Sequence, residues 1–314
     1  MTDTTFAQTE GLPLSQEQID AFRRDGVICV RQAYSEDWVG RIAAFLDDIV
    51  GHPSPIYGPR DPASTFHSDK DTWLTNDEVL DFVLHGPSAK IAQQAFGSNR
   101  VTFFYDQIFV KDELSPNPTP WHHDFTFWPV EGTQVASLWT SVDPVDAESS
   151  ALEFVAGSHR WPQRFRAIGA NGTDYSTGEN LDELPDFEAD RSKYDIVSWD
   201  LRPGDALLFD ALTLHGARGN RSAHKKRRAI TTRWCGDDVV YRSGRSRQFY
   251  HHGLRDGDAF SSWLYPQVLP RVIEEQLRVR LVGPVLPDPE LLKKANDHLS
   301  KLDRVNVPLD PAVG

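Results

Sequence analysis

Thr119-Pro120-Trp121-His122-His123-Asp124-Phe125 is the most informative segment of the chain. Side chains alternate along an extended strand, so His122 and Asp124 share one face and His123 points to the other. An imidazole nitrogen and a carboxylate oxygen two residues apart form part of the 2-His-1-carboxylate arrangement, which leaves coordination positions open on a non-haem iron. The segment therefore predicts a strand that carries two metal ligands, and a second histidine must come from elsewhere.

Two later segments offer a second histidine for such a site and an arginine that could bind a carboxylate. His215 ends an apolar, strand-like run and precedes a glycine-rich turn, which makes it a candidate for the second histidine. Further on, Arg227, Ala229, Thr231 and Arg233 would line one face of a strand. A guanidinium beside small residues is a good receptor for a carboxylate, because its planar fork can bind both oxygens.

The segments around these residues predict a mainly β fold of the α+β class. Short runs typical of strands cover 101–110, 135–142, 151–155, 206–209 and 229–234. Before them, Ser15 and Gln18 form a capping box for one helix, a second helix follows Ser35, and 76–96 has a helical rhythm. Such a pattern indicates an antiparallel barrel or sandwich with the N-terminal helices packed on one side.

Other segments interrupt this pattern. Residues 52–75 are expected to form a loop, and the polar segment 161–199 is expected to be one long insertion over the mouth of the barrel. The chain is less regular after 245, with a helix expected at 272–281 and a proline-punctuated end at 283–314. No shift in composition marks a linker, so a single domain over 1–314 is expected.

Composition excludes several classes of protein. Lys+Arg 33 against Asp+Glu 46 gives a net charge of −13 over 314 residues, so nucleic acid is not an expected partner. No apolar run is long enough to span a membrane and no secretion signal is evident, so no membrane partner is expected. Only Cys29 and Cys235 occur, which fits a cytoplasmic protein. The oligomeric state is left open.

In order and spacing, these motifs resemble the phytanoyl-CoA dioxygenase (PhyH)-like family of Fe(II)/2-oxoglutarate-dependent oxygenases. The resemblance runs from about residue 14 to 234. It rests on the helix and strand at 18–30 and on the segments 106–111, 119–124, 157–159, 204–205, 215–216 and 227–229. It implies a double-stranded β-helix, a cupin-like jelly roll, with a helical part at 14–96, a core at 100–240 and a C-terminal extension at 245–314.

The resemblance also implies a site. His122, Asp124 and His215 would bind Fe(II), and Arg227 would anchor the distal carboxylate of 2-oxoglutarate, with Arg228 as an alternative anchor. Positions that often line the co-substrate pocket in relatives match Gln107, Trp139 and Thr140. The chain departs from the family at Ser149-Ser150, where Asn-Gly is usual, and at His123, where glutamine is common.

The implied activity is a dioxygenase that uses O2 to hydroxylate a small organic molecule, or to oxidise an unactivated C–H bond in another way, with succinate and CO2 as co-products. Asp124 argues against halogenation, and secondary metabolism or catabolism is the expected setting. Alternatives are a metal-dependent cupin-type isomerase or hydrolase without 2-oxoglutarate, and a non-catalytic ligand-binding barrel. Candidate substrate residues, which could instead be structural, are Phe125, Phe127, Trp128, Lys111 and Arg233.

Overall fold

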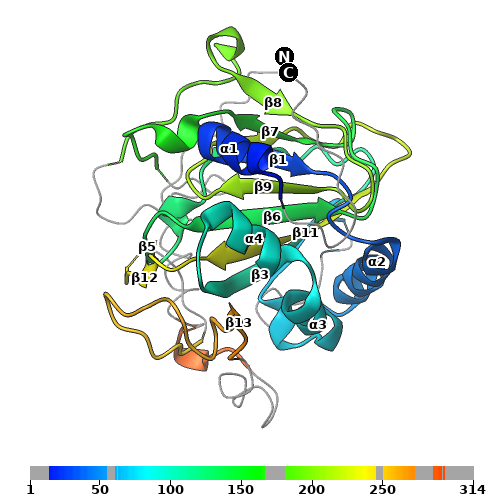
Figure 1. Ribbon diagram of the computed structural model, residues 1–314. Coiled ribbons are helices and arrows are strands. Elements are labelled where there is room, and N and C mark those ends of the chain that lie inside the picture. The colour runs from blue at the N-terminus through cyan, green and yellow to red at the C-terminus, as the bar shows by residue number, and fades with distance from the viewer. Residues whose placement is uncertain are drawn as a thin grey trace.

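A computed structural model describes residues 14–54, 61, 63–166, 181–244, 250–272, 286–291 and 293. The described residues form a large antiparallel sheet in the order β1-β9-β6-β11-β3-β13, with β2 also pairing with β3, and a smaller sheet in the order β4-β10-β7-β8. A two-stranded pair, β12-β5, lies beside them. Figure 1 shows helices α1 and α4 in front of the large sheet. This arrangement of antiparallel sheets is a jelly roll, as expected from the sequence.

The elements have the following bounds. The helices are α1 (Gln16–Asp25), α2 (Glu36–Gly51), α3 (Asp77–His85) and α4 (Ser88–Phe96), and the short 3-10 helices are η1 (Thr72–Leu74), η2 (Phe125–Phe127), η3 (Ser158–Arg160) and η4 (Arg191–Lys193). The large sheet contains β1 (Val27–Val30), β2 (Phe66–Lys70), β3 (Val101–Lys111), β6 (Val135–Ser141), β9 (Ala206–Asp210), β11 (Arg227–Cys235) and β13 (Gln267–Leu269). The remaining strands are β4 (Thr119–His122), β5 (Val130–Glu131), β7 (Leu152–Val155), β8 (Ile196–Ser198), β10 (His215–Ala217) and β12 (Val240–Tyr241).

The helices cover the outer face of the large sheet. The capping box at the start of α1 is present, because the Ser15 hydroxyl accepts from the Gln18 backbone N–H and the Gln18 side chain accepts from that of Ser15. Apolar residues of α1 to α4 and of the outer strand faces form the largest buried cluster, which includes Phe45, Phe82 and Trp234. Burial of this cluster stabilises the packing of the helices on the large sheet and so holds the strands in place.

A second buried cluster fills part of the space between the two sheets. It joins residues of the large sheet, such as Trp139 and Leu207, to residues of the small sheet, such as Leu152 and Phe154. Because residues on adjacent strands share a face when they are paired, the register of β11 with β6 and β3 places Thr231, Trp139 and Gln107 on the inward face. Thr231 and Trp139 are buried on this face, and Gln107 is partly exposed.

The structure confirms each of the predicted strands and the two helices after Ser15 and Ser35, and it differs from the sequence interpretation in three places. The predicted helical region 76–96 is two helices, since Gly86-Pro87 ends α3 and begins α4. The expected loop 52–75 contains β2 and η1. The expected insertion 161–199 contributes β8, which pairs with β7 at the edge of the small sheet. The helix expected at 272–281 lies outside the described residues, apart from Val272, and so does most of 283–314.

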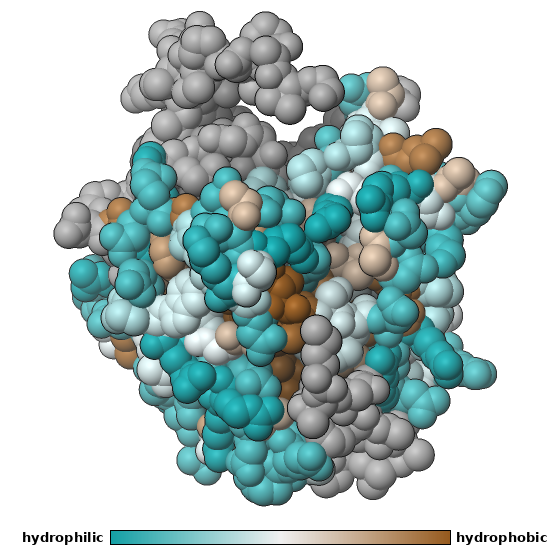
Figure 2. All heavy atoms as spheres, turned by 90° about the horizontal axis from the view of Figure 1, so that it is seen from above, coloured by the Kyte–Doolittle hydropathy of each residue, from teal (hydrophilic) through white to brown (hydrophobic). Residues whose placement is uncertain are grey.

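The surface seen from above in Figure 2 is largely hydrophilic, and hydrophobic spheres gather mainly in a narrow strip near its centre. Charged residues make up 25% of the chain, and charged side chains are rarely buried without a partner. Among the described residues, no helix has the length and apolar character needed to cross a bilayer.

Candidate metal centre and co-substrate pocket

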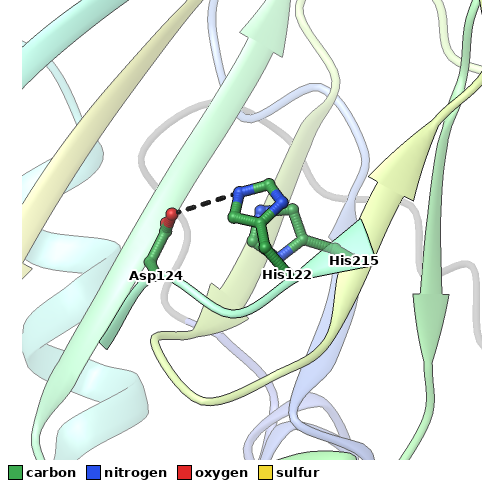
Figure 3. A group of neighbouring side chains, drawn as sticks. All are labelled: His122, Asp124 and His215. Carbon is green, nitrogen blue, oxygen red and sulfur yellow. Dashed lines mark ion pairs between the residues drawn. The ribbon is translucent and has the colours of Figure 1, made fainter. Parts of the chain in front are cut away.

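His122, Asp124 and His215 come together between the two sheets. Their possible ligand atoms all lie within 4.8 Å of one another, and the Nε2 of His122 is 3.5 Å from Oδ1 of Asp124. The structure brings the two histidines side by side because His122 at the end of β4 is the register partner of His215 at the start of β10. Figure 3 shows the carboxylate of Asp124 directed at the His122 ring, with His215 beside it. The predicted triad is therefore assembled.

Backbone carbonyls fix the orientation of both imidazoles. The Nδ1 of His122 is 2.8 Å from the carbonyl oxygen of Pro120, and the Nδ1 of His215 is 2.9 Å from that of Thr213. A carbonyl can only accept, so each Nδ1 carries the proton and donates, which leaves the lone pair on each Nε2. This arrangement is typical of histidines that bind a metal through Nε2.

The protonation states also suit a cation. Burial lowers the pKa of His215 to about 4, so its ring is neutral near pH 7. Burial alone would raise the pKa of Asp124, but its contact with His122 and the charges of His215 and Arg233 hold that pKa well below its usual range. The Ser137 hydroxyl also donates to Oδ2 of Asp124 at 3.2 Å. Two imidazoles that each present Nε2 and one carboxylate therefore face a common point, and this donor set fits a divalent iron.

Arg227 lies at the other end of the inward face of β11. Its guanidinium is buried and its Nη1 donates to the carbonyl and hydroxyl oxygens of Ser150, at 2.7 and 3.1 Å. Lys111, its register partner on β3, also donates to the Ser150 hydroxyl at 3.1 Å. The guanidinium carbon is 5.6 Å from the centre of the Trp139 ring. Trp139, the Arg227 guanidinium and the Lys111 amine thus line one end of the space between the sheets.

The alternative anchor, Arg228, points the other way. Side chains alternate along β11, and Arg228 forms ion pairs with Asp143 and Asp47 at 2.8 and 2.9 Å. These two carboxylates raise the pKa of Arg228 further. Arg228 is therefore committed to a partly exposed ion-pair network, and Arg227 alone of the two faces the interior.

Two other predicted pocket residues, Gln107 and Thr140, also face opposite sides of the large sheet. Gln107 faces inward, where its amide accepts from Arg233 at 3.1 Å and donates to the Ser68 hydroxyl at 3.0 Å. Thr140 follows Trp139 on β6 and so points to the helix side, where its hydroxyl donates to the Asp205 carbonyl at 2.7 Å. The structure places Thr140 away from the space that Trp139 lines.

The aromatic residues after Asp124 do not continue the strand. β4 ends at His122, Asp124 has a helical backbone conformation, and Phe125 and Phe127 lie in the 3-10 helix η2. The prediction that one regular strand carries both His122 and Asp124 is therefore wrong, although the two side chains still come together. The Phe127 ring lies 6.0 Å from that of His122, edge to face. Trp128 is buried, and its indole N–H donates to the Tyr105 hydroxyl at 2.9 Å. Of these three aromatic residues, Phe127 is the one in ring contact with a metal ligand, whereas all three take part in or pack against the largest core cluster.

Sequence reasoning missed the two serines that support the site. Ser137 orients Asp124, and Ser150 holds both Arg227 and Lys111. Ser150 has a φ of 70°, a conformation that favours glycine, which is the residue that the family resemblance leads one to expect there. A serine at a position suited to glycine was the available signal that its side chain has a role.

Comparison with known proteins agrees with this geometry. The family model for "Phytanoyl-CoA dioxygenase (PhyH)" matches residues 22–229. An ectoine dioxygenase of Sphingopyxis alaskensis (strain DSM 13593 / LMG 18877 / RB2256) is 28% identical over 237 residues, which cover 68% of this chain and 73% of that protein.

Two solved structures from nogalamycin biosynthesis share the fold. The non-haem alpha ketoglutarate dependent carbocyclase SnoK is 23% identical with a TM-score of 0.64, over 82% of this chain and 99% of its own. The epimerase SnoN, in complex with Fe3+, alpha ketoglutarate and nogalamycin RO, is 21% identical with a TM-score of 0.62, over 80% of this chain and 96% of its own.

The fold and the ligand set define a jelly-roll protein with a 2-His-1-carboxylate metal centre. Because the matched region spans well over half of the 314 residues, the chain belongs to the phytanoyl-CoA dioxygenase (PhyH) family. As a member of that family it is a dioxygenase, and His122, Asp124 and His215 are its candidate iron site.

Proposed function

We propose that this protein is an Fe(II)- and 2-oxoglutarate-dependent dioxygenase that hydroxylates a small organic molecule, or oxidises an unactivated C–H bond of it in another way, with release of succinate and CO2. The observation that carries the proposal is the combination of His122, Asp124 and His215 with the buried, inward-facing Arg227. The names of the relatives, a dioxygenase and alpha ketoglutarate dependent enzymes, support the same chemistry.

The three ligand residues would bind iron through two imidazole nitrogens and one carboxylate oxygen. When bound, iron together with 2-oxoglutarate and O2 supplies an oxidant able to take a hydrogen from a C–H bond. The protein's own part is orientation: the carbonyls of Pro120 and Thr213 hold the imidazole rings, and Ser137 holds the carboxylate of Asp124. These contacts direct the three ligand groups toward one point before a cation binds.

Arg227 would bind the distal carboxylate of 2-oxoglutarate. Its Nε is buried and has no hydrogen-bond partner among the described residues, so a donor is available for a carboxylate oxygen. Burial and the charge of Arg227 lower the pKa of Lys111 to about 6, because two cations share a small dry space. A dianion beside them would relieve that repulsion, so Lys111 acts with Arg227 on the co-substrate and not on the substrate.

An anaerobic titration with Fe(II) and then 2-oxoglutarate tests the proposal without knowledge of the substrate. Chelation of iron by 2-oxoglutarate should produce a visible charge-transfer band in the wild type. The His122→Ala variant should lose the band because it lacks a ligand. The Arg227→Ala variant should need roughly 10- to 100-fold more 2-oxoglutarate, as expected for loss of a charge-assisted hydrogen bond.

Arg228→Ala is the matched control, because it removes a neighbouring arginine whose side chain faces outward. It should give the same 2-oxoglutarate dependence as the wild type. Bound iron without a band would favour a metal-dependent isomerase or hydrolase. Failure to retain any metal would favour a non-catalytic binding barrel.

A further inference from the structure

Arg233 is a second buried arginine on the inward face of β11. Arg233 lies six positions after Arg227, which corresponds to roughly 20 Å of extended strand between the two backbone positions. Its register partner on β6 is Ser137, the residue that donates to Asp124. The charge of Arg233 also acts on the pKa of Asp124 and of His215. Arg233 therefore lies at the metal end of the space between the sheets.

The guanidinium of Arg233 is held in place before any ligand arrives. Its Nη2 donates to Gln107, which is itself oriented by Ser68 on β2. Its central carbon lies 4.3 Å from the centre of the Tyr105 ring and 5.9 Å from that of Trp128. Two aromatic rings and one amide thus fix the position of the charge, as in a preorganised anion site.

Two donors of Arg233 remain unused. Its Nε and Nη1 are buried, and neither has a hydrogen-bond partner within the described part of the chain. A buried donor without a hydrogen-bond partner costs free energy, most of all on a charged group. In native proteins such donors are therefore usually satisfied by a ligand or by water. The hydroxyl of Thr231, two residues earlier on the same face, is also without a partner there.

Among the described residues, no carboxylate forms an ion pair with Arg233. The charge of Asp71 acts on this region, but Asp71 pairs with Lys70 at 3.6 Å. The neighbouring Asp69 accepts from the backbone N–H and the hydroxyl of Ser54. Asp124 is one of the three candidate metal ligands. The guanidinium of Arg233 is therefore available to a carboxylate that the described residues do not supply.

We propose that Arg233 binds a carboxylate of the substrate, so that this enzyme acts on a small organic acid whose apolar or aromatic body lies against Tyr105 and Trp128. The inference rests on the proposed function and names its substrate class. A single guanidinium matches a single carboxylate, whereas a polyanionic acyl carrier would require several cations and would be repelled by an acidic protein. Arg233 would thereby set which carbon of the substrate faces the metal.

Binding of matched acid and amide probes tests this assignment. The probes are phenylacetate and phenylacetamide, indole-3-acetate and indole-3-acetamide, and cyclohexanecarboxylate and cyclohexanecarboxamide. The full chain, loaded with Mn(II) and saturating 2-oxoglutarate, is titrated with each probe by calorimetry. Wild type should bind at least one acid about tenfold more tightly than its amide, Arg233→Gln should lose this preference, and Arg233→Lys should retain part of it.

Arg228→Gln serves as the control variant, because it removes a guanidinium group of the same strand that faces outward. The 2-oxoglutarate affinity of Arg233→Gln, followed by the charge-transfer band with Fe(II), should stay within about threefold of the wild type, in contrast to Arg227→Gln. Equal binding of acids and amides by the wild type, or an acid preference that survives in Arg233→Gln, would overturn the assignment. A loss of 2-oxoglutarate affinity as large as in Arg227→Gln would show that Arg233 binds the co-substrate instead.

The two proposals fail in different ways. If the wild type shows no charge-transfer band, the proposed function fails, whereas an acid preference that depends on Arg233 can still be measured by calorimetry. If the band appears but no acid preference does, the dioxygenase stands and the substrate is not an acid.

Discussion

At the scale of single residues, Ser137 connects the metal centre to the large sheet. Its hydroxyl donates to Oδ2 of Asp124, and the other oxygen of that carboxylate faces His122. Ser137→Ala should weaken metal binding by about 10- to 100-fold, because residues that orient a ligand have effects of this size. Competition with a chromogenic chelator measures the Mn(II) affinity of the folded protein.

Ser141→Ala is the control, since Ser141 is a buried serine of the same strand whose hydroxyl donates to the carbonyl of Arg228. Its metal affinity should match that of the wild type. Equal losses in both variants would mean that damage to β6, and not orientation of Asp124, causes the effect.

The residue scale also shows what the sequence could predict of the site. His122 and Asp124 were found as a pair from their spacing in one short segment, but the strand ends at His122, and the turn at Asp124 brings its carboxylate to the His122 ring. His215 and Arg227 lie far along the chain, and only the order of family motifs connected them. Ser137 could not be found in this way, because a strand serine is common and its role depends on a partner on another element.

At the scale of elements, Gly26 joins α1 to β1 and supports the turn that presents His215. Its φ is 75°, and a Cβ there would lie 2.3 Å from the His159 ring and 2.4 Å from the Thr213 hydroxyl. Gly26→Ala should destabilise the fold by more than about 2 kcal/mol, from a left-handed conformation and a clash with backbone-bound groups. It should also weaken metal binding, because the Thr213 carbonyl orients His215.

Urea unfolding and metal titration of Gly26→Ala test both effects. Gly40→Ala is the control, because a Cβ at Gly40 in α2 would meet no atom within 4 Å. That change should raise the free energy of unfolding by about 0.5–1 kcal/mol, the difference between the two residues in a helix. A fully stable Gly26→Ala protein with weakened metal binding would point to a local movement of the turn alone.

Element length explains which parts of the fold were predictable. The long strands β3, β6 and β11 carry enough β-branched and aromatic residues to be recognised in isolation. The strands that hold the histidines, β4 and β10, span only four and three residues, and pairing defines them more than sequence does. β2 was missed because its sequence, Phe-His-Ser-Asp-Lys, has one apolar residue and is recognised only through its pairing with β3.

At the scale of the whole molecule, the two sheets supply different halves of the proposed complex. The small sheet carries His122 and His215, whereas Arg227 belongs to the large sheet. A metal bound with 2-oxoglutarate would therefore link the sheets through non-covalent bonds. Because both ligands bind only the folded chain, each should raise its stability by mass action.

If metal and co-substrate link the two sheets, 2-oxoglutarate should raise the melting temperature only after the metal is bound. With Mn(II) alone the melting temperature should rise, and 2-oxoglutarate at about 100 times its dissociation constant should add about 2.7 kcal/mol, or several degrees for a chain of this size. Without metal, 2-oxoglutarate should add little, since it would keep only its contact with Arg227. In Arg227→Ala the metal effect should persist, and the increment from the same 2-oxoglutarate concentration should fall to about 0.4–1.4 kcal/mol, as 10- to 100-fold weaker binding requires. EDTA should reverse both increments. If 2-oxoglutarate stabilised the metal-free protein as much as the metal-loaded one, the co-substrate would bind apart from the metal, and the sheets would not be joined through it.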